Sequence, residues 1–380
     1  MPHLLFLILL LLTASPTHGE PALSSHEALG EAFFFDPDLS LNRTQSCATC
    51  HSPAAGFVDP RDHATTGRAV SLGDDGHSLG VRNAPTLGYA AWVPPFRQRE
   101  DGEYAGGLFL DGRAESLQAQ ASGPLLSPLE MAMPDEAAVL ARLREKPRYV
   151  ESLEALFGEA VLEDPMLAVE AVTESLAAYQ RSPLFNAYDS KYDRSLRGEY
   201  QMSDEEELGR ILFFSQQFTN CNRCHQLQRI PGQKHEVFSN FEYHNVGTPG
   251  NPAIRDPDNL GEPYTDPGLA DNPRVDDAAA QRGKFRVPTL RNVAVTGPYL
   301  HNGVFEDLRT VVLFYDKFNN PNRKINPETG EPWREPEVAE NLSLEDLQHG
   351  PGLDEQRVDA LVAFLKTLTD RRFEPLLEAD

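Results

Sequence analysis

The sequence predicts a mainly α-helical protein with two related units and long ordered loops. Apolar residues recur at helical spacing in several segments, and no segment shows the sustained period-two alternation of a strand. The 380 residues suffice for about two domains, and the 30 prolines and 27 glycines favour loops over a continuous sheet. Several motifs also occur twice in the same order, which indicates an internal duplication.

Helical periodicity and one capping box predict four main helical segments. The expected helices cover residues 135–157 with a break at Pro147, 165–181, a segment that begins at Ser203, and 354–368. Ser203 and Glu206 have the spacing of a capping box, which marks the start of the third of these helices. The segment 245–282 is rich in Pro, Gly, Asn and Asp, and we expect it to be a long loop.

The duplicated motifs divide the chain into two units. The repeated blocks are Leu29–Phe34 with Leu208–Phe213, Pro85–Leu87 with Pro288–Leu290, and Asp111-Gly112 with Asn302-Gly303. We expect the boundary within residues 182–202. The two domains would then be residues 20–185 and 186–380, each with one copy of the blocks.

Each unit contains one Cys-x-x-Cys-His motif, and the chain has no other cysteine. The motifs are Cys47, Cys50 and His51, and Cys221, Cys224 and His225. Two thiols at this spacing can add to two vinyl groups of one porphyrin, and the adjacent histidine can bind the iron. Three other interpretations are less consistent with the sequence. A redox dithiol would not need the histidine twice. Two separate motifs are a poor basis for one zinc site, and disulfides at this spacing would be strained. We therefore expect two covalently bound haems c.

The sixth ligand of each iron decides whether the haem transfers electrons or does chemistry. Methionine is the usual sixth ligand in electron-transfer cytochromes c. The methionines are Met1, Met131, Met133, Met166 and Met202, so none follows the second haem motif. The remaining candidates for the second haem are His235, His244, His301, His349 and a tyrosine.

The net charge and the N-terminal sequence limit the partners and the cellular location that we expect. The formal net charge of −24 argues against a nucleic-acid partner and fits a solvated acidic surface or a face that docks a basic protein. Residues 1–19 have the features of a secretory signal peptide, with small residues Thr17 and Gly19 at the cleavage site. The apolar run Leu4–Leu12 is shorter than the roughly 20 residues that span a bilayer. We expect export to the periplasm and no membrane-embedded segment.

Further motifs resemble those of the bacterial di-haem cytochrome c peroxidase family, and within it the MauG-like branch. Besides the haem motifs they are Arg82–Leu87, Leu110–Arg113, Gly123-Pro124 with Glu130-Met131, Val287–Asn292 and Gly297–Gly303. The resemblance extends over nearly all of residues 25–370. It implies two cytochrome-c-like domains, with a peroxide-reactive haem in the N-terminal domain and an electron-transfer haem in the C-terminal domain.

The resemblance also implies roles for individual residues. Glu130 matches the active-site acid of the family, and Gln120 matches a glutamine upstream of it. In the MauG-like branch the second haem is bound by the tyrosine of a Phe-Tyr pair, which Phe314 and Tyr315 match. These matches make Glu130 and Gln120 the expected catalytic residues and Tyr315 the expected iron ligand.

Three other features follow from the same resemblance. A calcium ion between the haems is implied by Asn83 and by the carbonyl groups of Thr296 and Pro298, since calcium prefers oxygen donors. Peroxidases that require reductive activation hold a removable histidine in the loop after the first haem, where His77 is the better candidate. The family usually has tryptophan where this chain has Leu110, and leucine cannot be oxidised to relay an electron.

The resemblance implies an oxidoreductase that reduces hydrogen peroxide at the N-terminal haem with electrons passed through the C-terminal haem. A redox partner protein, such as a small cytochrome c or a cupredoxin, would supply these electrons. A second possibility is a MauG-like enzyme that oxidises residues of a partner protein. A third is a di-haem cytochrome that only transfers electrons, which requires protein ligands on both sides of each iron.

Overall fold

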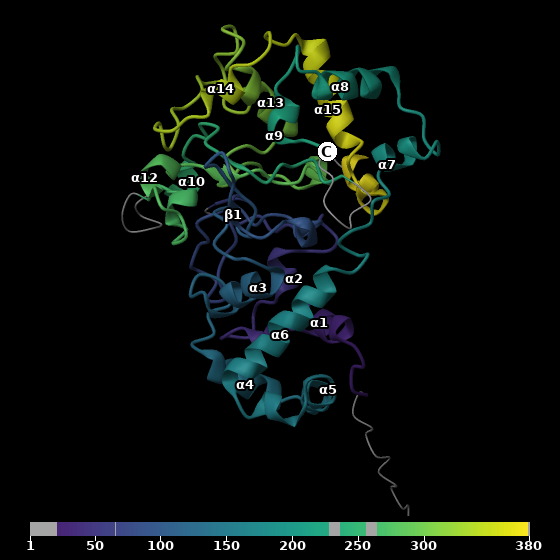
Figure 1. Cartoon of the computed structure of the whole chain (residues 1–380), viewed down its shortest axis with the longest axis vertical. Coiled ribbons are helices and arrows are strands. Elements are labelled where there is room, and N and C mark those ends of the chain that lie inside the picture. The colour runs from purple at the N-terminus through teal and green to yellow at the C-terminus, as the bar shows by residue number, and fades with distance from the viewer. Residues whose placement is uncertain (1–20, 65, 228–235, 256–263, 379–380) are drawn as a thin grey trace, which may run out of the picture.

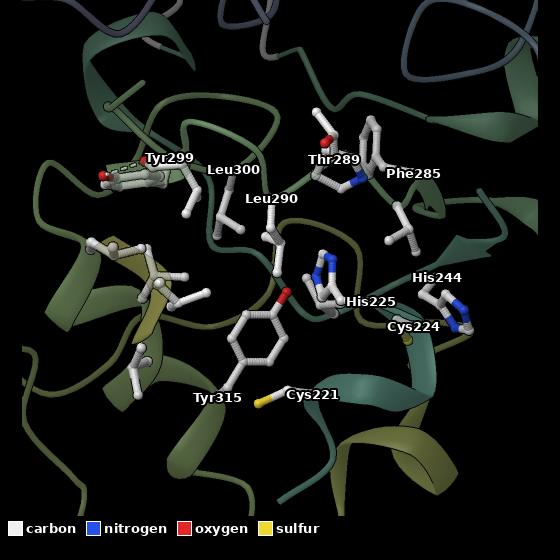
Figure 2. Close-up of a pocket in the computed structure, with 18 of the residues that line it drawn as sticks. Cys221, Cys224, His225, His244, Phe285, Thr289, Leu290, Tyr299, Leu300 and Tyr315 are labelled. Carbon is white, nitrogen blue, oxygen red and sulfur yellow. Dashed lines mark hydrogen bonds between the residues drawn. The ribbon is translucent and has the colours of Figure 1, made fainter. Parts of the chain in front are cut away.

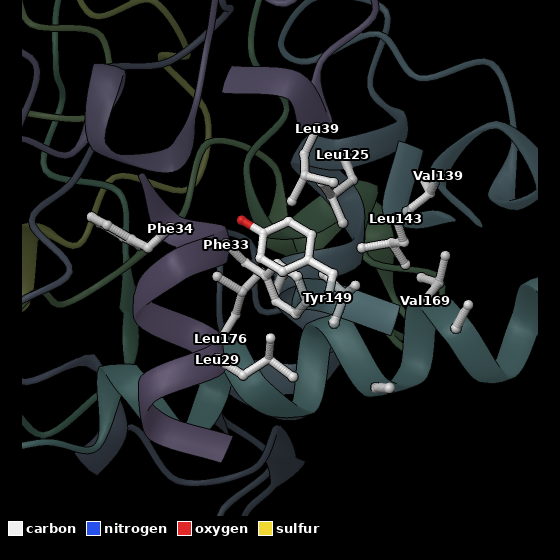
Figure 3. Close-up of a cluster of buried hydrophobic side chains, with 14 of the residues drawn as sticks. Leu29, Phe33, Phe34, Leu39, Leu125, Val139, Leu143, Tyr149, Val169 and Leu176 are labelled. Carbon is white, nitrogen blue, oxygen red and sulfur yellow. The ribbon is translucent and has the colours of Figure 1, made fainter. Parts of the chain in front are cut away.

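Two helical units make up the part of the chain that the structure describes. The computed structural model describes residues 21–64, 66–227, 236–255 and 264–378. Figure 1 shows the units stacked along the long axis, with the N-terminal half of the chain below and most of the C-terminal half above. The upper unit forms most of the wall of a cavity (Figure 2), and the lower unit contains a cluster of buried apolar side chains (Figure 3). Strands occur within the described residues only as two short antiparallel pairs, which confirms the mainly α-helical fold.

The elements follow the chain from the lower to the upper unit. The helices of the lower unit are α1 (His26–Phe34), α2 (Cys47–Cys50), α3 (Leu117–Leu126), α4 (Glu136–Arg144), α5 (Pro147–Phe157) and α6 (Pro165–Gln180). Those that follow are α7 (Lys191–Leu196), α8 (Asp204–Phe214), α9 (Cys221–Cys224), α10 (Pro252–Arg255), α12 (Ala278–Gln281), α13 (Leu308–Asp316), α14 (Leu344–Leu347) and α15 (Glu355–Lys366). The strand pairs are β1 (Arg97–Gln98) with β2 (Tyr104–Ala105), and β3 (Tyr243–His244) with β4 (Phe285–Arg286).

The helices expected from periodicity are present. Residues 135–157 form α4 and α5, and Pro147 occupies the first position of α5, where its missing N–H costs no hydrogen bond. Residues 165–181 form α6, and residues 354–368 form α15. No helix in the described ranges is long and apolar enough to cross a membrane.

The start of α8 and the long loop also agree with the sequence. Ser203 and Glu206 form the reciprocal bonds of a capping box at the start of α8. The described residues of the segment 245–282 are irregular apart from short helical turns such as α10 and α12. Its residues 256–263 lie outside the described part.

In the lower unit, α1 crosses α6 at a glycine. A Cβ at Gly30 would overlap the carbonyl oxygen of Ser175, so this approach requires glycine. The crossing lets Leu29, Phe33 and Phe34 become fully buried against α6 and its neighbours (Figure 3). Complete burial of such a side chain stabilises a fold by about 1.5–3 kcal/mol.

The upper unit repeats this arrangement with α8 and α15. A Cβ at Gly209 would overlap the carbonyl oxygen of Ala360. Beside this contact, the rings of Phe213 and Phe364 pack with their centroids 5.2 Å apart. The same glycine-mediated crossing in both units supports the predicted internal duplication.

The end of the chain returns to the lower unit. After α15, a 3₁₀ segment (Arg371–Glu378) brings Phe373 into the lower core, where its ring lies edge-on to Phe57 at 6.0 Å. Apart from Phe373, the buried residues of the lower core end at Phe185, and those of the second largest core begin at Tyr192. The C-terminal segment therefore connects the two units.

Candidate haem-binding sites

A cavity of about 330 Å³ surrounds the second Cys-x-x-Cys-His motif, lined mostly by the upper unit and on one side by residues 83–110 of the lower unit. Cys221, Cys224 and His225 line it, and Figure 2 shows the phenol oxygen of Tyr315 pointing toward the imidazole of His225. Much of the remaining wall is apolar: Phe213, Leu290, Leu300, Leu308, Leu361 and Leu365. Two thiols, a histidine and apolar walls are what a covalently attached haem requires, so these residues fit the group.

Both motif histidines are oriented by a backbone carbonyl. Nδ1 of His51 lies 3.2 Å from the carbonyl oxygen of Phe57, and Nδ1 of His225 lies 3.0 Å from that of Phe238. Donation of the Nδ1 proton leaves Nε2 of each ring available to bind iron. Burial lowers the pKa of both histidines, to about 4 for His225, which favours the neutral form that a metal requires.

The repeated Pro-Thr-Leu blocks contact these same histidines. The carbonyl of Pro85 contacts the ring of His51, and the carbonyl of Pro288 contacts the ring of His225. Each block therefore belongs to the wall of one haem site, which gives a structural reason for its recurrence after each haem motif.

The surroundings of the four cysteines do not suit redox chemistry. Burial raises the pKa of Cys47 to about 12 and that of Cys221 to about 11. Reactive dithiols instead have lowered pKa values, because the thiolate is the nucleophile. These shifts argue against a redox dithiol and agree with attachment of a haem.

Tyr315 is the candidate sixth ligand that faces His225 (Figure 2). Burial raises the pKa of Tyr315, and nearby charge on the cysteine sulfurs raises it further.

Three of the candidate histidines also line the cavity, but each has a ring nitrogen near another polar partner. These pairs are His244 with Asp346 at 3.4 Å, His301 with Glu337 at 3.2 Å, and His349 with the carbonyl of Gln216 at 3.2 Å. His235 lies outside the described residues.

In the lower unit, Glu130 lies close to the first haem motif. Besides burial, the charge of Glu130 raises the pKa of both Cys47 and Cys50. Burial also raises the pKa of Glu130 itself, while the positive charge of Arg113 opposes this shift. A raised pKa increases the affinity of the carboxylate for a proton, which suits Glu130 to accept one and pass it on.

The turn that carries Glu130 folds back on α3. The N–H of Met131 donates to the carbonyl of Pro124 at 3.1 Å, and the N–H of Asp74 donates to the carbonyl of Glu130 at 2.8 Å. Gln120 lies half-buried on α3 itself. Helix α3 and the turn after it therefore carry both expected catalytic residues.

The residues expected at a calcium site lie together where the units meet. Asn83, Thr296 and Pro298 all line the cavity, and the N–H of Asn83 donates to the carbonyl of His301 at 2.8 Å. In the described ranges, no group of three or more His, Cys, Asp or Glu side chains is arranged to hold a metal ion. Calcium binding at this place would therefore depend on amide and carbonyl oxygens.

Leu110 and His77 have different environments. Leu110 lines the same cavity, and its carbonyl accepts a hydrogen bond of 2.9 Å from the N–H of Arg286. The side chain of His77 is exposed, and its N–H donates to Asp75 in a turn at 2.8 Å. Leucine thus occupies a position beside the second haem site, whereas His77 faces solvent.

Two polar groups that no sequence motif indicates flank cysteines of the two haem motifs. The guanidinium of Arg61 lies 3.4 Å from the sulfur of Cys50 and pairs with Asp59 at 2.6 Å. His244 lies beside Cys224. Burial alone would lower the pKa of His244, but Asp346 and the sulfur of Cys224 raise it to about 9. A thioether bond at Cys224 would remove the contribution of a charged sulfur. Irregular loops carry most of these residues, so no periodicity marks them.

Comparison with known proteins finds relatives along nearly the whole chain. Residues 24–201 match the family described as di-haem cytochrome c peroxidase. The methylamine utilization protein MauG of Paracoccus denitrificans is 55% identical over 98% of this chain and 95% of that protein. The cytochrome c peroxidase Ccp of Escherichia coli is 32% identical over 74% of this chain and 51% of that protein.

Solved structures show the same relationship. The diheme peroxidase BthA from Burkholderia thailandensis superposes with a TM-score of 0.81 at 32% identity, covering 93% of this chain and 87% of that one. A MauG-like protein associated with microbial copper homeostasis gives a TM-score of 0.69 at 28% identity, covering 96% of each chain. The chain therefore belongs to the di-haem cytochrome c peroxidase family, a family of oxidoreductases that carry two haems c and that includes MauG.

Proposed function

We propose that the protein uses hydrogen peroxide at its first haem site to drive an oxidation, with the second site as an electron store. The observation that carries the proposal is the difference between the two sites. A half-buried acid, Glu130, lies near the cysteines of the first site, whereas Tyr315 faces His225 across the second. An acid beside the haem suits peroxide chemistry, and a tyrosine opposite the histidine completes the ligands of an iron.

Glu130 moves a proton at the first site. The haem iron supplies the centre at which the O–O bond of peroxide breaks. The Glu130 carboxylate takes a proton from one peroxide oxygen and delivers it to the other, so that the outer oxygen leaves as water. Burial raises the pKa of Glu130, which increases its affinity for that proton. The amide of Gln120 on α3 orients the peroxide by hydrogen bonding.

His225 and Tyr315 set the character of the second site. His225 donates its Nδ1 proton to Phe238 and presents Nε2 to the cavity, while Tyr315 presents its phenol oxygen from the other side. A phenolate ligand is anionic and stabilises oxidised iron. The positive charge of the metal offsets the burial that raises the pKa of Tyr315. The second site is therefore suited to storing oxidising equivalents.

The similarity to MauG favours a protein as the source of electrons. A relative that is 55% identical along the chain takes part in methylamine utilisation, as its name states. We infer that side chains of a precursor of methylamine dehydrogenase are oxidised, and that a small cytochrome c or cupredoxin is the competing donor. Export through residues 1–19 to the periplasm is part of the proposal, as is a calcium ion at Asn83, Thr296 and Pro298.

Spectra of the oxidised, haem-loaded protein before and after addition of hydrogen peroxide test the proposal. We expect one high-spin haem that responds to peroxide and one low-spin haem with a tyrosine ligand. A second measurement after partial reduction separates an inactive resting form from a protein without peroxide chemistry. Two low-spin haems that ignore peroxide in both states would contradict the proposal and leave electron transfer alone.

The electron source requires a separate measurement. Peroxide is added together with either precursor methylamine dehydrogenase or a reduced small cytochrome c, and the oxidation of each is followed. Faster oxidation of the precursor supports a protein substrate. Faster oxidation of the cytochrome would show a peroxidase of the ordinary kind.

A further inference from the structure

We propose that Tyr89 relays single electrons between the two haem sites, with the Asp370 carboxylate as the acceptor of its phenol proton. The inference rests on the proposed function, because peroxide at the first site supplies the oxidant. It concerns a position to which the repeated motifs assign no role.

Tyr89 lies on a segment that connects the two sites. The segment begins at Pro85, whose carbonyl contacts the ring of His51 in the first site. Four residues later, Tyr89 lines the cavity that also contains His225 and Tyr315. One short stretch of chain therefore contacts the iron ligand of one site and the wall of the other.

A second connection to the first site runs through aromatic packing. The N–H of Tyr89 donates to the carbonyl of Phe185 at 3.0 Å. The ring of Phe185 stacks on that of Phe57 with centroids 4.3 Å apart, and the carbonyl of Phe57 orients His51. Tyr89 is thus held by residues that pack directly against the first haem site.

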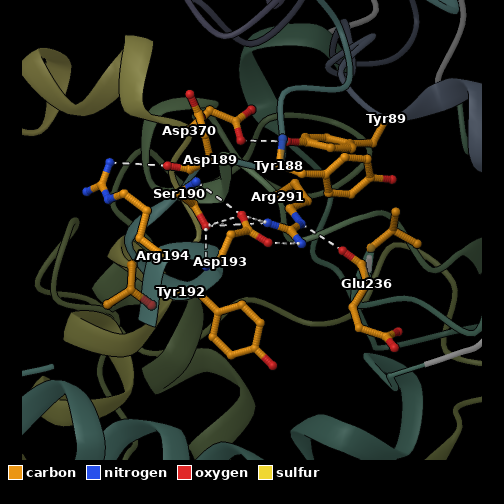
Figure 4. A network of polar contacts seen from close by, with 12 residues as sticks. Tyr89, Tyr188, Asp189, Ser190, Tyr192, Asp193, Arg194, Glu236, Arg291 and Asp370 are labelled. Atoms are coloured by element: carbon orange, nitrogen blue, oxygen red, sulfur yellow. Dashed lines mark hydrogen bonds and ion pairs between the residues drawn. The ribbon is translucent and has the colours of Figure 1, made fainter. Parts of the chain in front are cut away.

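The phenol of Tyr89 has a proton acceptor. Its Oη donates to Oδ1 of Asp370 at 2.5 Å and accepts from the N–H of Tyr188 at 3.1 Å (Figure 4). The side chain of Asn292 donates to the other carboxylate oxygen of Asp370 at 2.9 Å. Burial raises the pKa of Tyr89 and that of Asp370, so the phenol is protonated at rest and the carboxylate is a good proton acceptor. Transfer of the proton avoids a charged tyrosine in the interior, which would be costly.

The cation over the Tyr89 ring is neutralised. The guanidinium of Arg291 lies 5.4 Å from the Tyr89 ring and is fully buried, where a free positive charge would oppose removal of an electron. Asp193 binds it through two hydrogen bonds of 2.5 and 2.9 Å (Figure 4). The local charge around Tyr89 therefore does not prevent its oxidation.

The backbone of Tyr89 is strained. Its φ of 63° and ψ of 7° lie in the left-handed region, which is unfavourable for a bulky side chain. The corresponding residue after the second Pro-Thr-Leu block is Asn292, with φ 62° and ψ 12°, and asparagine tolerates this region. Strain of this kind costs about 1–3 kcal/mol and is found at functional sites. A tyrosine is thus held where the fold itself requires only a residue such as asparagine.

Other residues nearby are less suited to the role. Leu110 lines the cavity but cannot be oxidised. Trp92 packs in the same apolar cluster as Tyr89, but its buried indole N–H has no hydrogen-bond acceptor among the described residues. An oxidised Trp92 would have to keep its proton and its positive charge inside the protein.

The relay conserves atoms and electrons. Tyr89 loses one electron to the first site after peroxide has withdrawn electrons there, its O–H bond breaks, and an O–H bond forms on Asp370. Tyr89 then takes one electron from the second site and recovers the proton. Two such one-electron transfers supply two electrons. Together with two protons, these electrons reduce one hydrogen peroxide to two waters.

Electron paramagnetic resonance of the full, haem-loaded chain tests the relay. Samples are frozen within milliseconds of adding hydrogen peroxide, with and without ring-deuterated tyrosine. We expect a tyrosine radical signal that narrows on deuteration and is lost in both Tyr89→Phe and Asp370→Asn. The second variant keeps the tyrosine and removes only the proton acceptor.

Two control variants should keep the signal. Tyr149→Phe removes another buried tyrosine whose phenol bonds to an aspartate, Asp36 at 2.8 Å, but which lies on α5 at the far end of the lower unit (Figure 1). Trp92→Phe removes the competing aromatic side chain. Loss of the signal in either control but not in Tyr89→Phe would overturn the relay.

The outcomes separate the relay from the proposed function. If the haem spectra respond to peroxide but no radical signal depends on Tyr89, the relay alone is overturned. Haem spectra that do not respond in any redox state overturn the proposed function and the relay with it. Haem content and thermal unfolding of each variant establish that a lost signal does not come from a lost fold.

Discussion

The two haem-binding units share a scaffold and differ in the residues that approach from outside the repeated motifs. In each unit a glycine, Gly30 or Gly209, allows two helices to cross closely, and a backbone carbonyl orients the motif histidine. Beyond this shared frame, Glu130 lies near the cysteines of the first site, and Tyr315 faces the histidine of the second.

The difference shows how one duplicated scaffold can support two kinds of chemistry. The haem motif that occurs in each unit would supply the attachment of the haem and its first iron ligand. Glu130 comes from the turn after α3 and Tyr315 from α13, and neither lies in a block that recurs in the other unit. Changes in such segments can alter one site while the haem-binding frame stays the same.

Removal of the acid should have the largest effect and should be confined to the first site. Glu130→Gln keeps the size of the side chain but cannot move a proton, so we expect the rate of the peroxide reaction to fall by about 10²–10⁴-fold. Stopped-flow absorbance at the first haem measures this rate, and the spectrum of the second haem should be unchanged. Glu151→Gln, at an exposed position on α5, is the control. A wild-type rate in Glu130→Gln would show that another group moves the proton.

Removal of Tyr315 should change the second site and leave the first site unaffected. In Tyr315→Phe the second iron loses its anionic ligand, so we expect a new high-spin signal and a higher reduction potential, because oxidised iron is less stabilised. Tyr299→Phe is the matched control, since Tyr299 lines the same cavity but donates its phenol proton to the carbonyl of Val293 at 3.0 Å. Identical spectra for Tyr315→Phe and the wild type would exclude Tyr315 as the ligand.

The glycine crossings allow the two units to be destabilised separately. A Cβ at Gly30 would overlap Ser175 and one at Gly209 would overlap Ala360, so we expect Gly30→Ala and Gly209→Ala each to cost about 1–3 kcal/mol. Thermal unfolding followed at each haem should show earlier loss of the first haem in the former and of the second haem in the latter. Gly80→Ala, whose nearest neighbouring atom is 3.5 Å from the added Cβ, should change neither. Equal loss of both haems in both variants would mean that the units unfold together.

The sequence predicts local features of this molecule better than long-range ones. The haem motifs are contiguous, the helices α4 to α6 and α15 have clear periodicity, and α8 begins with a capping box, so all of these could be found without a structure. The contact of α1 with α6 at Gly30, and the pair between Arg291 and Asp193, join segments about a hundred residues or more apart and have no local pattern. The strained conformation of Tyr89 is likewise visible only once its neighbours are in place.

The smallest expected effect comes from the charge that tunes Glu130. Arg113 opposes the burial that raises the pKa of Glu130, and its side chain is 45% exposed, so solvent screens its influence. Because the carboxylate is the form that accepts the proton, kcat/KM for peroxide should fall as pH drops through the raised pKa of Glu130. Arg113→Gln removes a cation that favours the carboxylate, so the fall should move to higher pH. An exposed charge contributes about 0.2–1 kcal/mol, which corresponds to less than about one pH unit.

The pH profile of peroxide consumption measures this shift, and its response to salt identifies its origin. Above the titration range, Arg113→Gln should react at the wild-type rate, because Glu130 is ionised in both proteins. High salt should bring the two profiles together, since it screens an exposed charge. Arg97→Gln, which removes an exposed cation from β1, is the control. A shift to lower pH, or an equal shift in the control, would show that Arg113 does not act on Glu130 and that the first site sets the pKa of its acid by burial alone.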